Sequence, residues 1–111
     1  MYEYRAEIIH VVDGDTLKAR IDLGFYVHVE VTLRLARVDA PEMRELAGQL
    51  ARGFVLEELQ HVTMLHVSTR RTGKYGRWIA EVTYQLRGQP GVLHNLSDRL
   101  VATGHAQWIR S

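Results

Sequence analysis

Hydrophobic and polar residues alternate along most of the first forty positions, as in β-strands whose two faces meet different surroundings. Leu17, Ala19 and Ile21 share one face of such a strand, and Lys18 and Arg20 share the other. The apolar members of two neighbouring alternating runs are Tyr4, Ala6 and Ile8, and then Val27, Val29, Val31 and Leu33. We therefore expect three consecutive strands, with an Asp-Gly turn after the first and a glycine break after the second.

The period changes to that of a helix after residue 41. Leu46, Leu50 and Phe54 recur at four-residue spacing among strong helix formers, which predicts a helix over residues 44–60 with these side chains as its apolar face. The small or branched residues beside that face are Ala47, Ala51 and Val55. Two glycines, at positions 48 and 53, weaken the helical pattern.

Alternation returns over residues 62–67 and 78–84, which predicts two more strands. A last helix is expected to begin near Asn95 or Ser97, because either side chain can accept a hydrogen bond from the first free backbone N–H groups. Gly104 is typical of its end. Three strands, a helix, two strands and a helix predict a mainly β fold with α (α+β), and a five-stranded barrel of the oligonucleotide-binding (OB) type has this order.

Composition limits the possible classes of protein. The 111 residues, 46% apolar and 24% charged, fit one soluble domain over residues 1–111. No segment approaches the roughly 20 apolar residues that cross a bilayer. The polar, acidic N-terminus does not resemble a signal peptide, so we expect an intracellular or phage-encoded protein, with secretion left open. Without cysteine, oxygen or imidazole must hold any metal, and the six histidines lack ligand spacing.

Three short segments carry candidate chemistry. Residues 12–16 (Val-Asp-Gly-Asp-Thr) offer Asp15, and residues 34–42 place Arg34 five positions before Asp39, with Glu42 just past a proline bend. Residues 71–77 (Arg-Thr-Gly-Lys-Tyr-Gly-Arg) form a basic, glycine-containing turn. Carboxylates that hold a cation or place water, together with guanidinium groups that neutralise charge, are the parts of a phosphoryl-transfer site.

Each segment also has a purely structural explanation. The first is a hairpin turn, the acids of the second can cap the following helix with Arg34 paired to one of them, and the third is an ordinary basic hairpin tip. The formal net charge of +1 gives no strong attraction for a polyanion.

Together and in this order, the three segments resemble the signatures of the staphylococcal nuclease (thermonuclease) family. Residues 96–106, which end in a glycine-x-alanine sequence, resemble that family's final helix. The resemblance covers almost the whole chain and implies an OB-type barrel. It also implies a calcium-dependent nuclease that hydrolyses phosphodiester bonds of single-stranded DNA, duplex DNA and RNA and leaves 3′-phosphates.

The resemblance assigns a role to each matching residue. Asp15, Asp39 and the backbone carbonyl of Ala40 would ligate Ca²⁺. Glu42 would orient or deprotonate the attacking water. The residues that would bind the scissile phosphate and stabilise the transition state are Arg34 and Arg77, and those that would contact another phosphate of the nucleotide are Lys74 and Tyr75.

Two departures from the family pattern keep other functions open. The stretch between Glu42 and the helix is shorter than in the family's type member, and Arg110 stands near the position of a base-stacking tyrosine. Trp108 is either a substitute for that stacking or a core residue. The alternatives are a catalytically weak domain of this family that binds nucleic acid or a protein partner, and a plain OB binding module. The plain module would not need three acids that repel a polyanion without a metal. The oligomeric state is left undetermined.

Overall fold

The computed structural model describes residues 2–72 and 78–109. Its helices and strands, in chain order, are β1 (Tyr2–Asp13), β2 (Thr16–Asp22), β3 (His28–Leu35), β4 (Val38–Asp39), α1 (Leu46–Leu59), β5 (Val62–Thr72), β6 (Trp78–Leu86), β7 (His94–Asn95), α2 (Leu96–Ala102) and β8 (Gln107–Trp108). The five long strands and two helices follow the predicted order. The two-residue strands β4, β7 and β8 carry too few residues to show a period, and the sequence analysis missed them.

The long strands close into a barrel. Antiparallel pairing runs in the order β3-β2-β1-β5-β6, and a short parallel pairing of β3 with β6 closes the ring. That closure joins Leu33 to Trp78, Arg34 to Ile79 and Leu35 to Ala80. The predicted OB-type, mainly β architecture is therefore confirmed. Because the closing pairs include Arg34, the barrel seam itself fixes the backbone of a candidate site residue.

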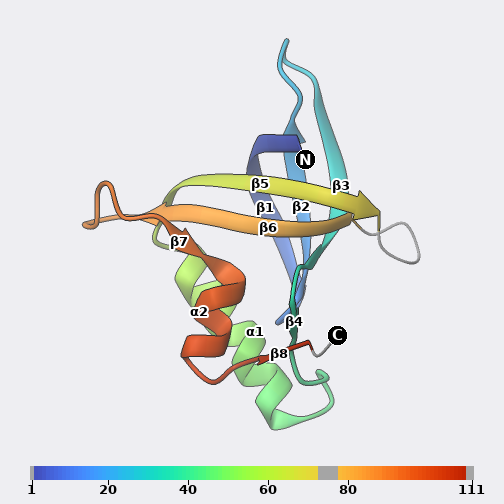
Figure 1. Ribbon diagram of the computed structural model, residues 1–111, viewed down its shortest axis with the longest axis vertical. Coiled ribbons are helices and arrows are strands. Elements are labelled where there is room, and N and C mark those ends of the chain that lie inside the picture. Colours follow the sequence, from blue (N-terminus) through green and yellow to red (C-terminus); the bar gives the residue numbers. More distant parts are fainter. Residues whose placement is uncertain (1, 73–77, 110–111) are drawn as a thin grey trace.

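The core fills the barrel and the space under the helices, which lie together at one end of it (Figure 1). The alternation in β2 is confirmed, since Leu17 and Ala19 are fully buried and Lys18 and Arg20 are exposed. In β3 the alternation holds only for the half inside the barrel. Val29 is exposed because the β2–β3 hairpin extends beyond the ring of strands (Figure 1).

The predicted apolar face of α1 is only partly right. Phe54 packs against the core, but Leu46 and Leu50 are 69% and 54% exposed. The buried side of the helix consists of Gly48, Ala51, Val55 and Glu58. Its two small residues lie at close contacts, Gly48 against the backbone of residues 41–42 and Ala51 against Gly14. Within the described residues, no helix is long and apolar enough to span a membrane.

Glu58 is a buried acid in the last turn of α1. Its carboxylate accepts hydrogen bonds from the Tyr84 hydroxyl at 2.7 Å and from Arg99 Nε at 2.8 Å. Burial raises the pKa of Glu58, but these two hydrogen bonds outweigh it and leave the pKa below its ordinary value. This hydrogen-bonded ion pair ties α1 to α2 and to β6.

The start of α2 agrees with the sequence. Asn95 caps it by accepting a hydrogen bond from the Asp98 N–H at 3.1 Å. Gly104 follows the helix with a φ of 81°, a conformation that glycine adopts without strain. Ser97, the other predicted cap, is fully buried, and its hydroxyl donates to the Ala36 carbonyl at 2.9 Å.

Candidate active site

Arg34 lies at the end of β3 and joins the two candidate metal-binding acids. Its Nη2 donates a hydrogen bond to Asp39 Oδ1, and its Nη1 lies 3.5 Å from Asp15 Oδ2. Nη1 also donates to the carbonyl oxygens of Leu35 and Val38, at 2.9 and 2.8 Å. The Arg34 side chain is only 14% exposed. Its guanidinium is therefore held by the backbone as well as by the acids.

Asp15 lies in the turn between β1 and β2 and is buried. Its Oδ2 accepts a hydrogen bond from the Ala40 N–H at 2.8 Å, and its Oδ1 accepts one from the Thr16 hydroxyl at 3.2 Å. Its own N–H donates to Asp13 Oδ1 at 3.0 Å. The Asp39–Ala40 peptide group is thus held directly at the Asp15 carboxylate through its N–H.

The environment of Asp15 disfavours its negative charge. Burial raises its pKa to about 6, and the side chain of Asp13 adds to the shift. The Ala40 N–H and the Arg34 guanidinium act in the opposite direction and do not cancel it. A carboxylate in this situation is stabilised by any further cation that comes into contact with it.

The turn that carries Asp15 packs against its neighbours at a glycine. A Cβ added to Gly14 would lie 2.7 Å from the Cβ of Ala40 and 2.9 Å from the Cβ of Ala51. Both distances are shorter than real Cβ contacts, so only glycine fits without movement of the backbone. Gly14 therefore sets how closely the turn approaches α1 and the segment after β4.

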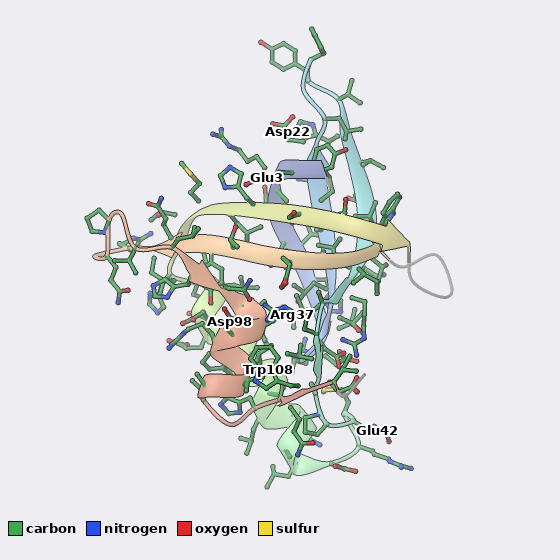
Figure 2. All side chains as sticks on the ribbon, viewed as in Figure 1. Glu3, Asp22, Arg37, Glu42, Asp98 and Trp108 are labelled. Atoms are coloured by element: carbon green, nitrogen blue, oxygen red, sulfur yellow. The ribbon has the colours of Figure 1, made fainter. Side chains whose placement is uncertain are left out.

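Glu42 does not join this cluster. Its side chain is 66% exposed and pairs with Arg44, at 2.6 Å between Oε2 and Nε. Figure 2 shows it in the loop before α1, well away from Arg37 and Trp108. The structure thus joins Asp15, Arg34, Asp39 and Ala40 by hydrogen bonds and ion pairs, whereas the carboxylate expected to act on water is paired with Arg44.

The other predicted contributors, Arg77, Lys74 and Tyr75, lie outside the described residues. The strand that follows them begins at Trp78, which pairs with Leu33 beside Arg34.

The sequence analysis missed a clamp built around Arg37, which is exposed and has a φ of 71°. Its Nε and Nη2 each donate to Glu81, at 2.8 and 2.9 Å, and Nη2 donates to Asp98 at 3.0 Å. Its guanidinium lies 5.0 Å from the centre of the Trp108 ring, beside α2 (Figure 2). Trp108 is 47% exposed, so it is not a core residue. We find no sequence signal that pairs Arg37 with partners so distant along the chain.

The clamp holds the segment that carries Asp39. Val38 and Asp39 of β4 pair with Trp108 and Gln107 of β8, and the Ile109 N–H donates to the Arg37 carbonyl at 2.8 Å. The position of Asp39 therefore depends on residues far along the chain.

The donor set suits a hard cation. Carboxylate and carbonyl oxygens are the ligands that Ca²⁺ prefers, usually six to eight of them. In the part of the chain that the structure describes, no three or more His, Cys, Asp or Glu side chains cluster to hold a metal. Asp15 and Asp39, held together through Arg34, and the Ala40 carbonyl are oxygen donors of the type that a hard cation prefers.

The structure is thus a five-stranded OB-type barrel with two acids and an arginine in contact at its seam. The family model for staphylococcal nuclease homologues matches residues 32–111. The chain belongs to that family.

Two curated relatives agree with this assignment. Protein ParB of Escherichia coli is 32% identical over 110 residues, which cover 94% of this chain and 56% of that protein. Micrococcal nuclease of Shigella flexneri is 28% identical over 106 residues, which cover 94% of this chain and 58% of that protein. The chain thus spans little more than half the length of the curated relatives it matches.

Proposed function

We propose that this protein is a calcium-dependent nuclease that hydrolyses phosphodiester bonds of DNA and RNA. The observation that carries the proposal is the shared guanidinium of Arg34, which contacts Asp15 and Asp39 at once. An all-oxygen cation site and a phosphate-binding arginine thus meet at one point of the barrel seam. The family membership and the similarity to micrococcal nuclease support the same activity.

In this proposal the protein groups bind and orient the substrate. Asp15, Asp39 and the Ala40 carbonyl hold Ca²⁺, which when bound neutralises charge on the scissile phosphate. Arg34 stays in place when Asp39 is engaged elsewhere, because the backbone carbonyls of Leu35 and Val38 also hold it. Both hydrogens of Nη1 stay on these carbonyls, so its Nε and Nη2 N–H groups meet the charge that builds on the phosphoryl oxygens. Arg77 serves as the second arginine. The residues proposed to contact a neighbouring phosphate are Lys74 and Tyr75.

Glu42 is proposed to take the proton of the attacking water. As the water oxygen bonds to phosphorus, the ester bond to the 5′ oxygen breaks, and that oxygen takes up a proton from solvent water. The products are a 3′-phosphate and a 5′-hydroxyl. Glu42 is exposed and bound to Arg44, so its carboxylate must leave that ion pair and turn toward the phosphate when substrate binds. General-base catalysis of this kind contributes on the order of a hundredfold to ten-thousandfold in rate.

One observation favours a second function, a domain that binds nucleic acid or a protein partner and cuts slowly or not at all. Glu42 lies outside the cluster of Asp15, Arg34 and Asp39. If the ion pair with Arg44 persists on binding, the site keeps its cation and its arginine but lacks a base.

Cleavage of labelled single-stranded DNA tests both functions. We expect cutting with Ca²⁺, none with EDTA, and a loss of at least about a hundredfold in the Glu42→Gln variant. Glu45→Gln is the matched control, because Glu45 is an exposed acid in the same loop and its side chain does not cap α1. If the protein binds DNA but does not cut it at any calcium concentration, the nuclease proposal is refuted and the second function, a binding domain, is supported.

A further inference from the structure

The end of the β2–β3 hairpin is an exposed apolar tip, which we define as residues 23–27 (Leu-Gly-Phe-Tyr-Val). It contains no charged residue, and Phe25 and Tyr26 are 97% and 99% exposed. Figure 1 shows this hairpin projecting from the barrel at the end opposite the helices. The tip therefore lies far from the cluster around Arg34, and its aromatic side chains contribute nothing to the core.

The tip also keeps its aromatic residues at a cost in backbone energy. Phe25 and Tyr26 have φ angles of 52° and 63°, in the left-handed region where asparagine and glycine are favoured in hairpin turns. The turn closes through hydrogen bonds from the Leu23 N–H to the Val27 carbonyl and from the Val27 N–H to the Gly24 carbonyl, both 2.9 Å. Two strained, fully exposed aromatic residues with no packing role indicate a contact with another molecule.

An apolar groove opens at the root of the same hairpin. It has a volume of about 440 Å³, and its lining includes Tyr4, Ile21, Leu23, Val29, Val31 and Trp78. In the register of the described strands, β3 pairs with β6 only over residues 33–35. The outer half of β3 therefore diverges from the rest of the barrel, which leaves the inner face of the hairpin uncovered.

The charges beside the tip argue against a polyanion or an anionic membrane as the partner. In the outer part of the hairpin, residues 18–32, the charges of Lys18, Arg20, Asp22 and Glu30 sum to zero. Arg20 and Glu30 lie 3.6 Å apart as an ion pair. Phosphate-rich partners are attracted by uncompensated lysine and arginine. A neutral apolar surface fits a protein surface of the same kind.

We propose that two copies of this chain associate through their hairpins, each inserting Phe25 and Tyr26 into the groove of the other. The aromatic residues of the tip cannot fill their own groove, because Ile21 and Val29 in that groove belong to the strands from which the tip projects away. A two-fold axis lets one surface supply both the insertion and the groove.

The area available suits a dimer with a small interface. An aromatic side chain buries about 150–250 Å², so the two in each tip bury roughly 300–500 Å² per partner, and the groove adds to this. A standard protein interface buries about 800 Å² per partner, and weak, transient complexes bury less.

The first test replaces the tip by Phe25→Asn with Tyr26→Gly, the sequence that this turn type favours. In sedimentation equilibrium from about 1 μM to about 1 mM, we expect the native chain to dimerise and the variant's dissociation constant to rise at least about a hundredfold. The variant should melt at the same temperature as the native chain or higher, because the turn strain is relieved. Leu93→Asn, a matched change at a leucine that is 65% exposed, should leave association unchanged.

The second test distinguishes insertion of the tip into the groove from non-specific hydrophobic association. Val29→Lys places a charge in the groove at a side chain that is 40% exposed, and we expect it to abolish self-association while the tip stays intact. Mixing it with the tip variant should give a heterodimer, since one intact tip then meets one intact groove. A native chain that stays monomeric would overturn the proposal, and so would a tip variant that dimerises normally or a mixture without heterodimer. Binding of the monomer to zwitterionic vesicles or to DNA through Phe25 would also overturn the proposal of a dimer, because the tip would then serve a different partner.

Discussion

Gly48 lies on the buried face of α1, where the helix meets the loop that carries Glu42. A Cβ at this position would lie 2.0 Å from the Glu42 carbonyl oxygen and 2.8 Å from the Pro41 carbonyl oxygen, where ordinary contacts begin at 3.4 Å. The atoms in the way are backbone, so the loop or the helix must move. Alanine in a helix gains up to about 1 kcal/mol over glycine, but overpacking against backbone costs about 3 kcal/mol. We expect Gly48→Ala to lower the free energy of unfolding by about 2 kcal/mol.

Gly53, in the same helix, provides the matched control. No atom lies within 4 Å of the Cβ that Gly53→Ala would add, and the residue is exposed. The helix-propensity gain is then unopposed, so we expect this variant to be more stable by about 0.5–1 kcal/mol. Two identical substitutions five residues apart should change stability in opposite directions.

Thermal unfolding followed by circular dichroism measures the difference, which corresponds to roughly 10 °C between the two melting temperatures. Because Gly48→Ala displaces the backbone of Glu42, DNA cleavage should also fall in this variant below the melting transition, while Gly53→Ala cuts normally. A Gly48→Ala protein as stable as Gly53→Ala would refute the close approach of α1 to the loop.

Three further predictions concern contacts away from the cluster. The folded-state pKa of Glu58 is lowered, so its contribution is complete above its ordinary pKa of 4.5 and is lost as the pH falls through the folded value. The stability deficit of Glu58→Gln, measured by urea unfolding, should therefore be large at neutral pH and shrink in acid. Ser97→Ala removes the hydroxyl bound to the Ala36 carbonyl and should cost about 1–3 kcal/mol in the same assay, since the carbonyl is left unsatisfied. Arg37→Gly should be more stable than Arg37→Ala by about 1 kcal/mol, because both lose the ion pairs but only alanine keeps the strained φ. Equal melting temperatures for the last pair would contradict the strain.

The strands of the barrel could be predicted because one face of each strand is buried and the other is not. Leu17 and Ala19 show this period without ambiguity. The face of α1 could not be predicted in this way. A helix that packs tightly against neighbouring backbone needs small residues at the contact. Gly48, at the loop before the helix, and Ala51, at the turn of Gly14, are therefore buried while Leu46 is exposed. Hydrophobicity alone ranks those residues in the wrong order.

The candidate site was only partly predictable. The spacing of Asp15, Arg34 and Asp39 marked residues that the barrel seam does bring together. Their supports were not visible in the sequence. Arg37 reaches partners more than forty positions away, and the pairing of Glu42 with Arg44 depends on the local course of the loop.

The strands that organise the site are made late in synthesis. A growing chain that has reached residue 72 already contains Asp15, Arg34 and Asp39, but it lacks β6, which closes the barrel beside Arg34, and β8, which pairs with the Asp39 segment. A chain of that length already contains the β2–β3 pairing that sets Arg34 opposite Thr16, next to Asp15. The seam beside Arg34 nevertheless stays open, and the Asp39 segment lacks its partner strand, until β6 and β8 have left the ribosome. The complete arrangement of the three side chains is therefore formed only after synthesis has reached residue 108.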